Sequence, residues 1–134
     1  MKSQYLNKPE LEHILASLMP ENRLALEVSL ATGLRIGDVL ALKTQKILKQ
    51  RFTIKEEKTG KTRNVYLPAE LWERCKAIAG RHYVFEHRYT ANDHRTRQAV
   101  FKDLQRSAKL FRVSEHISPH STRKVYAVEE YHKT

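Results

Sequence analysis

The residues of this sequence best suited to chemistry are cations and one imidazole, spread over three places in the chain. Arg35 follows a predicted helix end, Lys58 and Lys61 flank the turn of a predicted hairpin, and His120 and Arg123 lie three residues apart near the end of the chain. Guanidinium and ammonium groups donate hydrogen bonds to anionic oxygens, and an imidazole exchanges a proton near neutral pH. Such a set suits an anion, above all a phosphate.

The motif near the end of the chain begins at Ser118-Pro119, which predicts a helix N-terminus with Ser as N-cap and Pro as the first helical residue. His120, Arg123 and Lys124 then cluster at the start of that helix, with His120 and Arg123 on one face. Cations there are mildly unfavourable against the helix dipole, whereas the free N–H groups at the same end bind phosphate well. The cluster therefore favours a bound anion.

Taken singly, each group also has a plainer interpretation. An arginine after Thr-Gly usually lies on the surface, lysines beside a hairpin turn are usually solvated, and a His-x-x-Arg pair at a helix start is usually a polar face. Asp38 follows Arg35 by three residues, so on a helix it is close enough to orient the Arg35 guanidinium.

The overall charge supports an anionic partner. Lys and Arg number 25 against 15 Asp and Glu, which gives a formal net charge of +10, and the sequence pI is about 9.9. A basic excess of this size is typical of domains that bind polyanions, most often nucleic acids. With 40% hydrophobic residues in 134, the chain is expected to form a single domain with a core.

Several classes of site are not expected. The single Cys75 excludes an internal disulfide and a cysteine-based zinc site. His116 and His120 have a zinc-like spacing, but Ser118-Pro119 lies between them, so we expect no metal. Neither a Gly-rich phosphate loop nor a paired-carboxylate nuclease motif is present. There is no signal peptide and no apolar run of bilayer length, so we expect a cytoplasmic, DNA-associated protein with no membrane contact.

The elements that must position these residues are mainly helices. Apolar periodicity and Pro or Gly boundaries predict helices from about residue 8 to 18, 20 to 33, 36 to 42, 68 to 80 and 96 to 111. Residues 51–68 alternate around Thr59-Gly60, which predicts a β-hairpin, and residues 83–85 suggest a short strand. The expected fold class is mainly α with a small antiparallel β-hairpin or sheet.

Read in order, these stretches resemble the catalytic domain of the tyrosine recombinases, the phage integrase family. The matching pieces are YLNKPELEHILASL, ATGLRIGDVLAL, IKEEKTGKTRNVYLP, TRQAVFKDLQRSAKL and SPHSTRK. ATGLR with an acid three residues after the Arg is fairly specific, whereas His-x-x-Arg alone is weak. The resemblance implies the DNA breaking-rejoining fold of that catalytic domain, here as one truncated domain over residues 1–134.

The resemblance also implies roles for individual residues. Arg35 and Arg123 are expected to grip the scissile phosphate, and Lys58, or else Lys61, to protonate the departing 5′ oxygen. His120 is expected to assist proton transfer, with Asp38 supporting Arg35. The cations expected to contact the DNA backbone are Lys61, Arg63, Arg97 and Lys124.

The chemistry implied is attack of a tyrosine hydroxyl on DNA to form a 3′-phosphotyrosyl bond, which requires no metal, nucleotide or other cofactor. In the family the nucleophile lies well beyond His-x-x-Arg, whereas here only Tyr126 and Tyr131 follow Arg123. We therefore expect this chain to bind the phosphate backbone without completing cleavage.

Three functions compete at this point. The first is a fragment of a site-specific recombinase or integrase, which binds double-stranded DNA, takes no small-molecule substrate and self-associates on DNA in its full-length form. The second is a degenerate, non-catalytic DNA-binding protein on the same scaffold. The third, an RNA-binding module, ranks last because no RNA-recognition signature is present.

Overall fold

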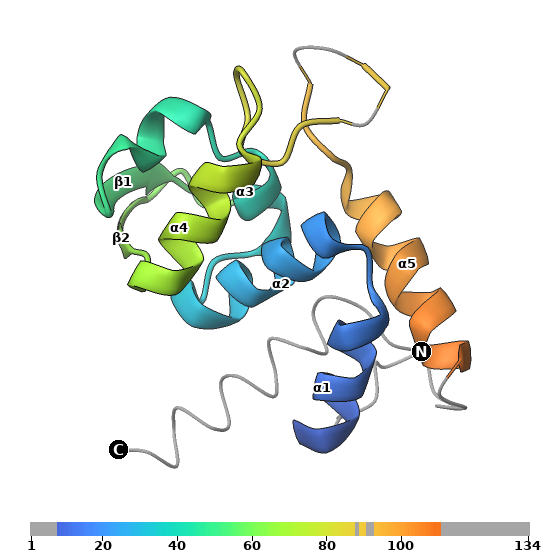
Figure 1. Ribbon diagram of the computed structural model, residues 1–134. Coiled ribbons are helices and arrows are strands. Elements are labelled where there is room, and N and C mark those ends of the chain that lie inside the picture. The colour runs from blue at the N-terminus through green and yellow to red at the C-terminus, as the bar shows by residue number, and fades with distance from the viewer. Residues whose placement is uncertain (1–7, 88, 91–92, 111–134) are drawn as a thin grey trace.

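The computed structural model describes residues 8–87, 89–90 and 93–110, and these fold mainly into helices. The elements in chain order are α1 (Lys8–Ser17), α2 (Pro20–Thr32), α3 (Ile36–Leu40), the 3₁₀ helix η1 (Thr44–Leu48), β1 (Arg51–Lys55), β2 (Thr62–Tyr66), α4 (Ala69–Ile78) and α5 (Arg97–Leu110). Figure 1 shows α2 in the middle of the molecule, with the β1–β2 hairpin and α4 toward one end and α1 beside α5 toward the other. The expected fold class is confirmed.

Helix α2 is central because apolar residues occupy more than one of its faces. Leu24, Ala25, Leu26 and Val28 are all at most 2% exposed, and a helix with apolar residues on several sides must be covered on several sides. Helices α3 and α4 both pack against it. The prediction of a helix from about residue 20 to 33 is confirmed.

The end of α2 determines how the chain enters α3. Gly33 has φ of 77°, a left-handed conformation that glycine adopts without the steric penalty of a Cβ. Its N–H donates to the Ser29 carbonyl at 2.8 Å, and the Ser29 hydroxyl donates to the Leu34 carbonyl at 2.6 Å. These bonds turn the backbone sharply at the predicted helix end.

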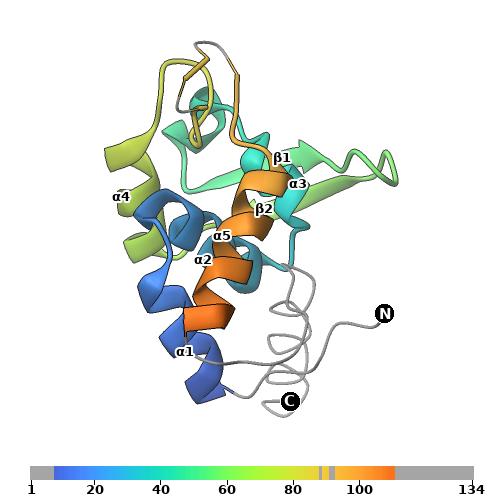
Figure 2. The same cartoon turned by 90° about the vertical axis from the view of Figure 1, so that its right-hand side faces the viewer.

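The two strands form an antiparallel hairpin in which Phe52 pairs with Val65 and Ile54 with Arg63. Phe52 and Ile54 are half-buried and Val65 is buried, whereas the residues between them are exposed, as expected from the two-residue alternation of a strand with one buried face. Figure 2 shows that the turn of the hairpin projects away from the helices. Gly60 in this turn has φ of 69°, which explains the glycine there.

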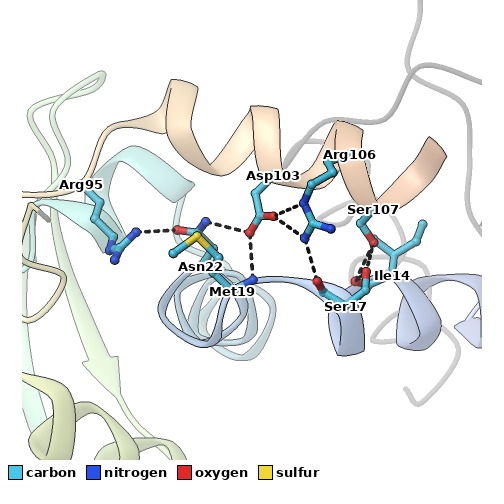
Figure 3. Close-up of polar contacts among 8 residues, drawn as sticks. All are labelled: Ile14, Ser17, Met19, Asn22, Arg95, Asp103, Arg106 and Ser107. Atoms are coloured by element: carbon cyan, nitrogen blue, oxygen red, sulfur yellow. Dashed lines mark hydrogen bonds and ion pairs between the residues drawn. The ribbon is translucent and has the colours of Figure 1, made fainter. Parts of the chain in front are cut away.

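A polar network joins α1, α2 and α5 (Figure 3). The Asp103 carboxylate accepts hydrogen bonds from the Met19 N–H at 2.9 Å, the Asn22 amide at 2.8 Å and the Arg106 guanidinium at 2.7 Å. Burial alone would raise the pKa of the Asp103 carboxyl, but the bonds from Asn22, Arg106 and Met19 outweigh burial and lower it. The network fixes the helix that carries Arg97.

Two local predictions differ from the structure. Residues 83–85 do not form a strand: Tyr83 makes an isolated bridge with Lys43, and Glu86 makes one with His94. Val84 and Phe85 are nonetheless fully buried, so their apolar character reflects a connection that crosses the core. The 3₁₀ helix η1 was not predicted, because its residues show no helical periodicity.

The helix predicted from about residue 96 to 111 is found as α5, Arg97–Leu110. Val100, Leu104 and Ala108 are buried and Phe101 is half-buried, while Phe111 lies outside the described residues. None of the helices in the described part of the chain has the length and apolar character needed to cross a membrane.

Candidate functional site

Arg35 is held at the start of α3 by the residues on either side of it. Leu34 and Ile36 are 1% and 7% exposed, so both neighbours are fixed in the core. Arg35 itself has extended backbone angles, φ −66° and ψ 147°, as the N-cap of α3. Its side chain is 40% exposed. The buried neighbours therefore place a solvent-facing guanidinium at a defined position.

The Arg35 guanidinium binds a carboxylate that the sequence analysis did not single out. Its Nη1 donates to Glu56 Oε2 at 2.8 Å, and the Glu56 side chain is 11% exposed. Glu56 follows β1 directly, and its N–H donates to the Lys61 carbonyl at 2.8 Å. The ion pair ties the start of α3 to the base of the hairpin turn. It holds the guanidinium in one orientation while much of its surface faces solvent.

Arg35 and the hairpin turn border one surface depression. Its volume is about 390 Å³, and it is lined by Arg35, Gly37, Asp38, Glu57, Lys58 and Arg97. We call it the Arg35 pocket. Three of its side chains are cations that come from three separate parts of the sequence: the α3 start, the hairpin turn and the α5 start. Folding thus gathers Arg35, Lys58 and Arg97 around one depression.

A glycine makes room for the third cation. A Cβ added to Gly37 would lie 3.3 Å from Cδ of Arg97, which is tighter than ordinary van der Waals contact. The Arg97 side chain therefore crosses α3 where that helix has no side chain. This close approach brings the α5 cation to the pocket.

Comparison with known proteins identifies the scaffold. The sequence profile of the phage integrase family matches residues 4–132 of the chain. The chain belongs to the phage integrase family. No curated protein sequence matches it.

Solved structures share the integrase fold. The catalytic core of lambda integrase superposes with a TM-score of 0.77 at 22% identity, covering 94% of this chain and 81% of that one. XerA recombinase superposes with a TM-score of 0.71 at 16% identity, covering 99% of this chain and 52% of that one. XerH recombinase, in a pre-cleavage complex with its difH substrate, gives 0.71 at 23% identity, with 96% and 43% covered. The chain thus spans most of an integrase catalytic core but about half or less of the longer recombinases.

Only some of the remaining residues of the integrase motifs lie within the described part of the chain. His120, Arg123 and Lys124 lie outside the described residues, as do Tyr126 and Tyr131, so their predicted roles stay predictions. Of the two candidate lysines, Lys58 lines the Arg35 pocket, and the exposed Lys61 is not among the lining residues. Geometry favours Lys58 for a role at the pocket. In the described ranges, no group of three or more His, Cys, Asp or Glu side chains could hold a metal ion.

Two of the predicted site residues, Asp38 and Arg63, make contacts that the sequence did not predict. Asp38 accepts a hydrogen bond from the Glu57 N–H at 3.1 Å, so it fixes the hairpin turn against α3, whereas the carboxylate bound to Arg35 is that of Glu56. Spacing of three residues suggested a contact with Arg35, but Arg35 lies before the helix, with extended backbone.

Arg63, expected to contact DNA, has its guanidinium turned toward the protein. It donates to the carbonyls of Gly33 at 3.3 Å and Thr32 at 3.2 Å, and its Nε lies 3.7 Å from Glu56 Oε1. Carbonyls at a helix C-terminus carry partial negative charge and attract a cation. Arg63 therefore neutralises the end of α2 and supports Glu56.

The position of Glu56 has a sequence signal that was overlooked. Phe52 and Ile54 occupy the inward face of β1, and the same two-residue step places Glu56 on that face. A carboxylate on a buried face requires a cationic or hydrogen-bonding partner. Its ion-pair partners, Arg35 and Arg63, could only be identified once the hairpin was placed beside α3.

Proposed function

We propose that this chain is part of the catalytic domain of a site-specific tyrosine recombinase, and that it binds double-stranded DNA with one phosphodiester in the Arg35 pocket. The observation that carries the proposal is the convergence of Arg35, Lys58 and Arg97 on a single depression. The net charge of +10 supports a polyanionic ligand of this kind.

In this proposal Arg35 donates to the non-bridging oxygens of the phosphate. A guanidinium has five donors in a fixed plane and stays protonated. One donor nitrogen of Arg35 is bonded to Glu56, which leaves the others for the ligand. A cation fixed in this way also stabilises the charge that develops as the phosphorus becomes five-coordinate.

The covalent step follows from the same arrangement. A tyrosine hydroxyl attacks the phosphorus and passes its proton to a base, for which His120 is our candidate, the phosphorus–O5′ bond breaks, and the 5′ oxygen takes up a proton from an acid. Lys58 is our candidate for the donor of that second proton, because its ammonium lines the pocket that would hold the phosphate. His120 and Arg123 are proposed to complete the site.

DNA binding is tested by fluorescence anisotropy with a labelled short duplex over a range of salt concentrations. Arg35→Ala removes one phosphate contact, so the slope of log affinity against log salt should fall in magnitude by about 1. Arg23→Ala is the matched control, since Arg23 is 43% exposed and paired with Glu27 on α2. Equal slopes for both variants would contradict the proposal.

The cleavage step is tested separately with a nicked duplex, whose covalent adduct with the protein survives denaturing electrophoresis. An adduct that disappears in Tyr126→Phe or Tyr131→Phe would assign the nucleophile. Binding without an adduct would favour the alternative for this chain, a DNA-binding protein on the recombinase scaffold that does not itself cleave.

A further inference from the structure

Two more surface depressions continue from the Arg35 pocket. The first, of about 340 Å³, lies between α3, η1 and β1 and shares Asp38 and Glu57 with the Arg35 pocket. The second, of about 410 Å³, shares Lys43 and Gln45 with the first and is otherwise lined by Arg81, His82 and Tyr83. Neighbouring depressions share lining residues, and we call the surface that the three of them occupy the basic groove.

We propose that the basic groove binds the DNA backbone next to the phosphate held in the Arg35 pocket, and that Lys43 and Arg81 hold a second phosphate at its far end. This inference rests on the proposed function, because it takes the Arg35 pocket as the first phosphate site. It also predicts the path of the DNA: the bound DNA strand runs from the Arg35 pocket past η1 toward the loop that follows α4.

The charge along the basic groove favours a polyanion over a single anion. Seven Lys and Arg side chains line it against two carboxylates, the cations being Arg35, Lys43, Lys46, Lys55, Lys58, Arg81 and Arg97. One of the carboxylates, Asp38, accepts a hydrogen bond from the Glu57 N–H. An excess of cations over carboxylates across several depressions suits a ligand that carries several phosphates.

The cations at the far end are available for a ligand. Lys43, Arg81 and His82 are exposed, and within the described part of the chain no ion pair engages Lys43 or Arg81. The acidic side chain nearest to them in sequence, Glu86, accepts the Arg81 backbone N–H at 3.3 Å. The Arg81 guanidinium and the Lys43 ammonium are therefore outside the ion pairs of the described residues.

The far end is also built on fixed backbone. The Thr44 N–H donates to the His82 carbonyl at 2.9 Å, the Thr44 hydroxyl donates to the Gly80 carbonyl at 2.7 Å, and Lys43 bridges with Tyr83. The Tyr83 ring packs edge-on against His94, with 5.1 Å between ring centroids. These contacts join the segment that contains Lys43 to the segment that contains Arg81. Because the backbone of both segments is already fixed, less conformational entropy is lost when a ligand binds.

The test compares Lys43→Ala/Arg81→Ala with a charge-matched control, Lys76→Ala/Lys109→Ala. Lys76 and Lys109 lie in the last turns of α4 and α5, and neither lines the groove. Affinity for a random-sequence duplex is measured by anisotropy over a range of salt concentrations. The salt slope of the groove variant should fall in magnitude by about 2, one for each phosphate contact, and that of the control by less than half as much.

The outcomes separate this inference from the proposed function. If the wild type binds DNA in a salt-dependent manner and the groove variant and the control have the same salt slope, the proposed role of the basic groove is wrong. The proposed role of the Arg35 pocket would be unaffected by that result. Absence of wild-type binding would overturn both. Lys43→Arg/Arg81→Lys keeps both charges and should keep the salt slope of the wild type. If the alanine double variant also keeps the melting temperature of the wild type, its loss of DNA affinity is not caused by unfolding.

Discussion

The guanidinium of Arg35 and the carboxylate of Glu56 form a 2.8 Å ion pair between the start of α3 and the end of β1. On its other oxygen, Glu56 faces Arg63 Nε at 3.7 Å, and Arg63 also binds the carbonyls at the end of α2. A single carboxylate thus joins a solvent-facing arginine to a structural one. The pair orients Arg35 before any ligand arrives, which reduces the ordering needed on binding.

Loss of the Glu56 charge should weaken DNA binding despite making the protein more basic. Glu56→Gln releases Arg35, whereas Glu57→Gln removes an exposed carboxylate from the rim of the same pocket. We expect Glu57→Gln to bind a duplex slightly more tightly than the wild type. Glu56→Gln should bind roughly five- to tenfold more weakly than Glu57→Gln, which corresponds to about 1 kcal/mol. Equal affinities in an anisotropy assay would show that Glu56 acts on DNA only through its charge.

A side chain at position 37 should displace Arg97 without unfolding the protein. In Gly37→Ala the new Cβ would meet Arg97 Cδ at 3.3 Å, and a flexible side chain can move away. Alanine also favours a helix over glycine by up to ~1 kcal/mol, so the melting temperature should not fall.

The effect on DNA is measured by a double-variant cycle. Gly37→Ala should weaken duplex binding in the wild-type background and have no effect when Arg97→Ala is already present, because both changes act through the same side chain. Additive losses in the two backgrounds would indicate that Gly37 affects DNA binding independently of Arg97.

Asp103 should make stability sensitive to acid. Its folded pKa is lower than its usual value of 3.8, so its contribution is complete above 3.8 and is lost as the pH falls through the folded pKa. Asp103→Ala leaves the Met19 N–H and the Asn22 amide unpaired and should cost about 2 kcal/mol at neutral pH.

The acid effect is measured by urea unfolding at several pH values. Glu73→Gln is the control, because Glu73 is 66% exposed and a surface ion pair contributes little. A stability loss in Asp103→Ala that is as large below the folded pKa as at neutral pH would contradict the assigned role of the charge.

Cys75 should be protected from alkylation in the folded protein. It is fully buried, and burial raises the pKa of its thiol from 9.0 to about 11, so little thiolate is available for reaction. Between these two values the unfolded thiol ionises while the folded one stays neutral, so the free energy of unfolding should fall as the pH rises through this range. Iodoacetamide labelling followed by mass spectrometry, with and without urea, checks the protection. Rapid labelling without urea would show that the core around Cys75 opens readily.

The sequence predicted those structural features that depend on a few neighbouring residues, and it missed those that depend on contacts between distant parts of the chain. The helix starting at Pro20, its end at Gly33 and the hairpin around Gly60 each rest on backbone preferences of a few residues, and each was found where expected. The partners of Arg63 lie 30 and 31 residues earlier in the chain. No spacing rule connects them, so the sequence did not predict that Arg63 binds the end of α2, and its contact with DNA stays a prediction.

The same difference between local and long-range features applies to the candidate site. Arg35 was identified because it follows a predicted helix end, and Lys58 because it flanks the turn of a predicted hairpin. Their approach to Arg97 depends on the missing side chain of Gly37 and on the docking of α5. These relations exist only in the folded chain, and only the resemblance to the integrases connected the residues in advance.

The most direct test of a phosphate site at the Arg35 pocket is a titration with duplex DNA, followed through the arginine Nε–Hε resonances in ¹H–¹⁵N NMR spectra. Assignment comes from single arginine variants. The Arg35 and Arg97 resonances should shift or broaden as DNA is added, while those of Arg23 and Arg74, both held by Glu27, should stay in place. Shifts at Arg23 and Arg74 with none at Arg35 and Arg97 would place the DNA on another face and contradict the account.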